Sequence, residues 1–110
     1  MSKIRDTFEE LKCEGRCALI PFIMGGDPSL EVTGQLIKVA EANGANILEI
    51  GIPFSDPMAD GPVLQKAAQR SLAQGVRIRD LFRVVKESRE ETDIPIVFLA
   101  YYNSVCNYGQ

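Results

Sequence analysis

The sequence predicts an α/β fold in which parallel strands alternate with helices. Three short apolar runs, at residues 17–24, 47–52 and 94–101, have the length of buried strands, and the segments between them show helical periodicity. Strands that are joined through helices pair in parallel, because each connection returns the chain to the same end of the sheet. Such β/α units build either an open doubly wound sheet or a closed barrel.

The size and composition fit one globular domain. The chain has 110 residues, of which 45% are hydrophobic and 25% charged, with a formal net charge of −3. These values are close to globular averages, so disordered, collagen-like and disulfide-scaffold proteins are excluded. The negative net charge predicts no binding to nucleic acid or to an anionic membrane.

Histidine and cysteine content limits the chemistry. The chain has no histidine, which removes the Ser-His-Asp triad. Cys13, Cys17 and Cys106 lack the spacing of a metal site and are interpreted as ordinary thiols. The odd cysteine count and the charged N-terminal segment predict a reducing compartment without a signal peptide. Acid–base chemistry would therefore use carboxylates, Tyr, Lys or Cys.

The first two elements are a helix and a strand. The helix is expected to begin at Ser2 as its cap and to end at Gly15. Its apolar face consists of Ile4, Phe8 and Leu11. Residues 17–24 follow as a strand buried on both faces, although Pro21 weakens regular pairing.

The second helix is expected over about residues 28–43, with Asp27 as the cap and Pro28 at the first helical position. Its apolar side consists of Leu30, Leu36, Ile37 and Ala40. The preceding Gly25-Gly26-Asp27 is interpreted as a turn and helix cap and not as a phosphate cradle. It has neither the three glycines of a dinucleotide fingerprint nor the lysine of a P-loop.

The remaining elements continue the alternation. Residues 47–52 form the second strand, and an irregular loop follows over 53–61. Helices are expected over 62–74 and 79–91. The side chains expected to face inward from the latter helix are those of Leu81, Phe82 and Val85. Residues 94–101 form a third buried strand.

Glu49 interrupts the apolar run 47–52 and is the most informative candidate. A carboxylate that loses hydration in a buried strand has a raised pKa, which suits general acid–base catalysis. Barrels and open α/β sheets both place their active sites at the carboxyl ends of strands. The alternative is a structural ion pair, for example with Lys66.

Asp60 lies at the far end of the loop that leaves the second strand, so the loop can bring it near Glu49. Asp60 could equally cap the helix that Pro62 opens. Asp56 in the same loop is interpreted as a turn former or contact residue. Apolar residues at strand ends either line an aromatic-binding pocket or belong to the core, namely Phe22, Leu99, Tyr101 and Tyr102.

Three motifs resemble the alpha subunit of tryptophan synthase. They are Pro21-Phe22-Ile23 with Gly26-Asp27-Pro28, the long run from Leu48 to Pro62, and Tyr102-Asn103. The resemblance extends over essentially the whole chain but only over the first part of that family's fold, a TIM (β/α)8 barrel with an extra N-terminal helix. It implies that residues 1–110 are the N-terminal portion of one barrel domain, containing that helix and the first three β/α units.

The resemblance implies aldol cleavage of indole-3-glycerol phosphate to indole and glyceraldehyde 3-phosphate, a carbon–carbon lyase step of tryptophan biosynthesis. Glu49 matches the family's acid–base carboxylate, and Asp60 matches the carboxylate that holds the indole N–H. The residues implied around the indole ring are Phe22, Ala59, Leu64, Leu99 and Tyr102.

The resemblance also implies a partner. The loop from Pro53 to Asp60 resembles the family's contact with the beta subunit in an α2β2 tetramer, with Pro53 and Asp56 as interface residues. The beta subunit carries pyridoxal phosphate, and no cofactor or metal is expected in this chain. The expected location is the cytoplasm, or the plastid stroma for a plastid-encoded chain.

Two other functions stay open. The family binds the substrate phosphate through loops after later strands, which this sequence does not contain. The chain could therefore be a noncatalytic fragment that binds a partner or complements the rest of a barrel. It could also belong to a free-standing indole-glycerol-phosphate lyase. We expect no indole release from the isolated 110-residue chain.

Overall fold

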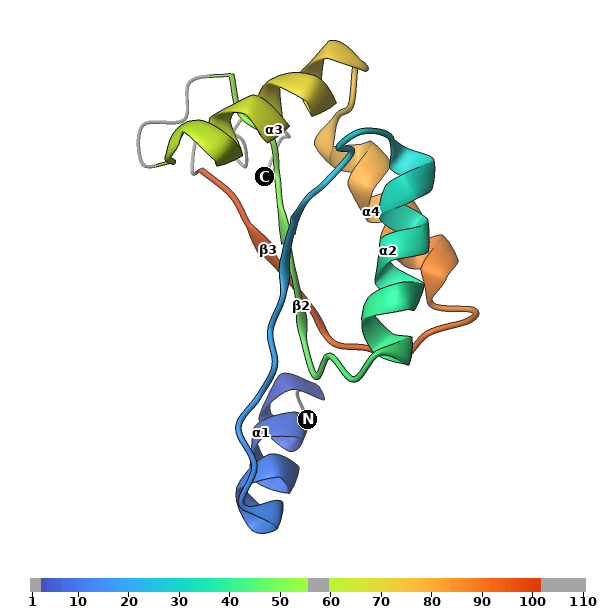
Figure 1. The fold of residues 1–110 in the computed structure, drawn as a ribbon. Coiled ribbons are helices and arrows are strands. Elements are labelled where there is room, and N and C mark those ends of the chain that lie inside the picture. The colour runs from blue at the N-terminus through green and yellow to red at the C-terminus, as the bar shows by residue number, and fades with distance from the viewer. Residues whose placement is uncertain (1–2, 56–59, 102–110) are drawn as a thin grey trace.

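The computed structural model describes residues 3–55 and 60–101, which form a three-stranded sheet with helices (Figure 1). The elements in order are α1 (Lys3–Glu14), β1 (Phe22–Met24), α2 (Leu30–Ala42), β2 (Leu48–Gly51), α3 (Pro62–Ala73), α4 (Ile78–Ser88) and β3 (Ile96–Leu99). The strand order is β1-β2-β3, and both pairings are parallel. The predicted α/β fold with a parallel sheet is confirmed.

The two faces of the sheet differ in what covers them. Leu48 and Ile50 of β2 are fully buried and pack with Ile37 of α2 and Ile94 in the main core cluster. Figure 1 shows α2 and α4 side by side against this face. Alternate residues project from the other side, which we call the open face. It is formed by Phe22, Met24, Glu49, Gly51, Val97 and Leu99.

Helix α2 begins later than the sequence predicted. Its cap is Ser29, whose Oγ accepts a hydrogen bond from the Val32 N–H at 3.2 Å. The expected cap at Asp27 and the expected helical position of Pro28 are therefore wrong. The Asp27 carboxylate instead receives a bidentate ion pair from Arg70, so it is not available to the helix.

Helices α3 and α4 follow the predicted order. Helix α3 ends just before Gly75, which has a φ of +77°, a value that glycine adopts without strain. Helix α4 begins where the Asp80 carboxylate accepts from the Arg77 N–H at 2.9 Å, and it ends at Ser88 instead of residue 91. Leu81 is buried, whereas Phe82 is partly exposed and meets Phe98 edge-on, so the inward orientation expected for Phe82 is only partly correct.

Two strands are shorter and more exposed than expected. The predicted strand 17–24 is regular only over Phe22–Met24, and Leu19 and Ile20 lie largely in solvent. Leu19 is held by hydrogen bonds to Asn46 and Ile47 and not by a continuous ladder: its N–H donates to the Asn46 Oδ1, and its carbonyl accepts from the N–H groups of both residues. On β3, Val97 and Leu99 are 37% and 49% exposed, because only the other side of this strand packs under the helices. The expectation of full burial for both strands is wrong.

Helix α1 lies beyond the amino-terminal ends of the strands, far from α3 (Figure 1). It is confirmed over Lys3–Glu14, with Leu11 buried and Phe8 about half exposed. The expected cap Ser2 lies outside the described residues. Among the described helices, none is long and apolar enough to cross a membrane.

Candidate active site at the carboxyl edge of the sheet

The carboxyl ends of the strands, the start of α3 and residues after β3 enclose a cavity of about 160 Å³. That is the volume of about five liquid water molecules, which leaves room for a planar ring. The lining is mainly apolar, with Asp60 and Tyr101 as the residues with polar side-chain groups, and consists of Phe22, Met24, Gly51, Ile52, Asp60, Leu99, Ala100 and Tyr101. A largely apolar cavity with a small number of placed polar groups is typical of a site for an aromatic ligand.

Asp60 is positioned by the start of α3. Gly61 is the cap of this helix and makes no side-chain cap bond, so the alternative of Asp60 as the cap is wrong. The Gln65 Nε2–H donates to the Asp60 backbone carbonyl at 2.8 Å, which ties Asp60 to the first helical turn. Within residues 3–55 and 60–101, no hydrogen bond occupies its carboxylate, which leaves this group able to accept one from a ligand.

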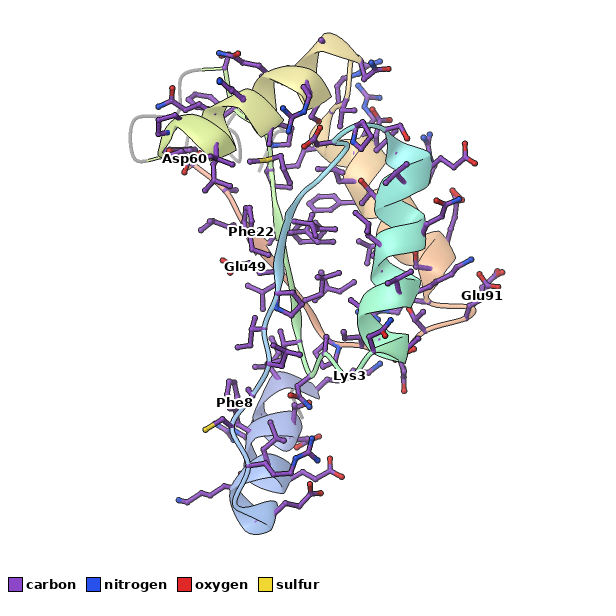
Figure 2. The ribbon with its side chains drawn as sticks, viewed as in Figure 1. Lys3, Phe8, Phe22, Glu49, Asp60 and Glu91 are labelled. Atoms are coloured by element: carbon purple, nitrogen blue, oxygen red, sulfur yellow. The ribbon has the colours of Figure 1, made fainter. Side chains whose placement is uncertain are left out.

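Glu49 lies half-buried at the middle of the open face, in register between Phe22 of β1 and Val97 of β3. Among the described residues its carboxylate has no ion pair, and the alternative pairing with Lys66 is not seen. Glu49 does not line the cavity itself. Figure 2 shows Glu49, Phe22 and Asp60 on the side of the sheet away from α2 and α4.

The other predicted site residues divide into three groups. Phe22 and Leu99 line the cavity together with Asp60. Leu64 is half-buried on α3 and is not part of that lining, and Pro53 is buried. The predicted site residues Asp56, Ala59 and Tyr102 lie outside the described residues.

Four lining residues, Met24, Gly51, Ile52 and Ala100, were not predicted for the site, whereas Tyr101 was named from the sequence as a candidate lining residue. A Cβ on Gly51 would lie 2.7 Å from the Phe22 Cζ and 3.2 Å from the Met24 Sδ, so a glycine is needed here. Tyr101 lines the cavity and stacks on Phe54, with ring centroids 5.3 Å apart. The sequence signal for this placement of Tyr101 is the alternation of Val97, Leu99 and Tyr101, because residues two apart on a strand share a face.

The turn after β1 uses its amides internally. The Gly25 N–H donates to the Gly51 carbonyl at 2.9 Å, and the Gly26 N–H donates to the Thr33 Oγ1 at 2.8 Å. A phosphate cradle needs free amides pointing at the ligand. The interpretation of Gly25-Gly26-Asp27 as a turn is therefore confirmed. Beside it, the hydrogen bonds that the Arg70 guanidinium donates to the Asp27 carboxylate raise the pKa of Arg70 above its usual value.

Cysteine and acidic residues form no metal centre in the part of the chain that the structure describes. No group of three or more His, Cys, Asp or Glu side chains lies close enough to hold a metal ion there. Cys13 and Cys17 are exposed free thiols.

Residues 8–110 match the family model described as tryptophan synthase alpha chain. The chain belongs to this family. A curated relative, the tryptophan synthase alpha chain of Caldanaerobacter subterraneus, is 50% identical over 109 residues, which are 99% of this chain and 42% of the relative. The chain thus spans about two fifths of the length of the curated alpha chains it matches.

Solved alpha chains confirm the fold. The tryptophan synthase alpha subunit of Legionella pneumophila has a TM-score of 0.96 and 40% identity, over 99% of this chain and 42% of that one. A structure titled for mutual activation of the tryptophan synthase α2β2 complex of Pyrococcus furiosus has a TM-score of 0.78 and 39% identity, over 84% and 37%. The described elements are therefore the first part of the family's β/α barrel, as the sequence predicted.

Proposed function

We propose that this chain supplies the two catalytic carboxylates for aldol cleavage of indole-3-glycerol phosphate to indole and glyceraldehyde 3-phosphate. This reaction is a carbon–carbon lyase step in tryptophan biosynthesis. One observation carries the proposal. Asp60 lines an apolar cavity beside Phe22, and Phe22 is the register partner of Glu49 on the same face of the sheet. Membership of the alpha chain family supports the assignment.

Glu49 is the proposed acid–base group. Its carboxyl group donates a proton to indole C3, which gives the indolenine tautomer. The ring of this tautomer can accept the electrons of the breaking carbon–carbon bond. Glu49 then takes the proton from the glycerol hydroxyl as the carbonyl of glyceraldehyde 3-phosphate forms. Its half-buried position suits this role, and within the described residues no ion pair occupies the carboxylate, which leaves its oxygens available to a substrate.

Asp60 is the proposed electrostatic group. Its carboxylate accepts a hydrogen bond from the indole N–H and stabilises the positive charge that the ring nitrogen gains in the indolenine tautomer. Phe22, Leu99 and Tyr101 surround the place where the ring would lie. This apolar wall excludes water and strengthens the interaction between the carboxylate and the nitrogen.

The proposed partner is a tryptophan synthase beta subunit in an α2β2 complex, and pyridoxal phosphate belongs to that subunit. The Pyrococcus furiosus complex supports this proposal, because its alpha chain is 39% identical to this chain where they match. The contact is assigned to the loop over 53–60. Since the Pro53 ring is buried in this chain, Asp56 is the better candidate for direct contact.

The substrate phosphate is assigned to later β/α units of the family's fold, because the glycine amides after β1 are already used. The three β/α units of this chain would then need the remaining units of the barrel in order to turn over substrate. Accordingly, we expect the 110-residue chain alone to release no indole.

A chimera tests the proposal. Residues 1–110 replace the matching segment of the Caldanaerobacter relative, and indole release from indole-3-glycerol phosphate is measured. The chimera should be active, and Glu49→Gln and Asp60→Asn should each lower kcat strongly. Gln69→Ala, an exposed position on α3, serves as the matched control. The proposal would be contradicted if the chimera is active and its kcat is unchanged by both carboxylate substitutions.

A further inference from the structure

Helix α3 connects the turn after β1 to Asp60. Its N-terminal end follows Asp60 directly, and Gln65 holds the Asp60 carbonyl. Near its other end, Arg70 and Ser71 contact the turn after β1. The two ends are separated by about ten residues, or about 15 Å along the helix axis. A rigid helix of this length transmits a displacement from one end to the other.

The contact between α3 and the turn is built from three hydrogen bonds. The Ser71 Oγ–H donates to the Gly25 carbonyl at 2.7 Å, and Ser71 is fully buried. The Arg70 Nε and Nη2 donate to the two Asp27 carboxylate oxygens at 2.8 and 2.9 Å. We call Arg70, Ser71, Gly25 and Asp27 the turn clamp. A bidentate guanidinium pair fixes an angle as well as a distance.

The close approach of α3 to the turn requires a glycine at position 26. Gly26 has a φ of +81°, and a Cβ there would lie 2.5 Å from the Ser71 Oγ. Between the clamp and Asp60, Ala67 and Ala68 pack on Met24, with Phe22 against the same cluster. These contacts are apolar and therefore non-directional, so they orient α3 less sharply than hydrogen bonds do. The polar bonds of the turn clamp supply the directional constraint.

We propose that Arg70 and Ser71 are positioning residues for Asp60, which set where its carboxylate lies over the cavity by holding α3 against the turn after β1. This inference rests on the proposed function, because it takes the indole N–H as the group that Asp60 meets. Neither Arg70 nor Ser71 lines the cavity. Both therefore act through the helix and not by touching a ligand.

The test compares two probes that differ by one donor. Indole has an N–H, whereas 1-methylindole does not, so the ratio of their affinities reports the contact with Asp60. Affinities are measured on the 110-residue chain by following amide signals in NMR titrations, which also show that each variant is folded. The unaltered chain should prefer indole by about tenfold to a hundredfold, the range for one hydrogen bond to a charged group.

The variants separate this inference from the proposed function. Asp60→Ala removes the side-chain acceptor and should bring the affinity ratio near one. Arg70→Ala and Ser71→Ala should each lower the ratio at least twofold, while the affinity for 1-methylindole is retained. Arg70→Lys should keep part of the preference that Arg70→Ala loses, since lysine keeps the charge without the bidentate geometry. In the Asp60→Ala background, Arg70→Ala should have no further effect. Gln69→Ala, exposed on the same helix, should leave the ratio unchanged.

Each contrary result has a defined meaning. If Asp60→Ala removes the preference and both clamp variants keep it, the positioning role is overturned and the proposed function survives. If Asp60→Ala keeps the preference, or if the chain binds neither probe, the role given to Asp60 and the positioning role both fail. Equal loss of affinity for both probes in Arg70→Ala would show a general structural role and would also overturn the inference.

Discussion

Phe22 of β1 and Glu49 of β2 are register partners in adjacent parallel strands, so their side chains project from the same face of the sheet. Phe22 lines the cavity that also contains Asp60, whereas Glu49 lies just beside it. The Glu49 carboxylate thus lies on a strand within the sheet, whereas the Asp60 carboxylate lies just before the N-terminal cap of α3. The distance between them is therefore sensitive to how α3 packs on β1.

Replacement of Glu49 should affect catalysis and leave stability nearly unchanged. In the chimera, Glu49→Gln should lower kcat by about 10²- to 10⁴-fold, the usual contribution of a general acid–base group. The free energy of unfolding should change by less than about 0.5 kcal/mol, because no ion pair is lost in the described residues. Steady-state kinetics and urea denaturation measure the two effects. Glu9→Gln on α1 is the comparison, and an equal kcat loss there would contradict the assignment.

Gly51→Ala should close part of the cavity. Its Cβ would lie 2.7 Å from the Phe22 Cζ, and relief of this overlap should cost about 1–3 kcal/mol in the free energy of unfolding. Indole affinity should fall as well, since Phe22 must move into the space for the ring. Chemical denaturation and NMR titration test both effects.

Gly34→Ala in α2 is the matched control for Gly51→Ala. Its Cβ would make only an ordinary contact at 3.6 Å from the Val84 Cγ1, and alanine should stabilise the helix by about 0.5–1 kcal/mol. The two glycine substitutions should thus change stability in opposite directions. Equal effects at both positions would show that the overlap with Phe22 is not the cause.

Thr33→Val should loosen the turn after β1. The buried Thr33 hydroxyl accepts from the Gly26 N–H at 2.8 Å and donates to the Ser29 carbonyl at 3.1 Å. Valine has nearly the same shape but leaves that N–H unsatisfied, which should cost about 1–3 kcal/mol in the free energy of unfolding. Thr7→Val, whose hydroxyl lies on exposed α1, should cost far less by the same denaturation assay.

The attachment of α1 should weaken in acid. The hydrogen bond from Lys3 lowers the pKa of Asp93 below its ordinary value of 3.8. A carboxyl with a lowered folded-state pKa stabilises the fold above its unfolded-state pKa, and this contribution disappears as the pH falls through the lowered value. The Tm of Lys3→Met should therefore be slightly lower than that of the unaltered chain at pH 6 and equal to it at pH 2. A Tm difference that persists at pH 2 would refute this role for the ion pair, and Lys12→Met on the same helix should show no difference at either pH.

Local patterns were sufficient to predict the element order and the parallel sheet. Apolar periodicity placed Ile37 and Leu81 in the core, and both are buried. Cap positions were predicted less well, because Ser29 and Asp27 are both good caps and only the ion pair with Arg70 decides between them. That partner lies 43 residues away in sequence, so no local pattern could reveal it.

The sequence by itself determined the family, through the long motif from Leu48 to Pro62. It also singled out Glu49 as a carboxylate within an apolar strand, while Asp60 stayed open between a site residue and a helix cap. Only the tertiary structure decided that Asp60 lines a cavity with Phe22 and that α3 is held to the turn after β1 by Arg70 and Ser71. The physical reason is that residue types and periodicity fix local conformation and burial. Distances between elements, in contrast, depend on strand register and on polar contacts between residues far apart in the chain.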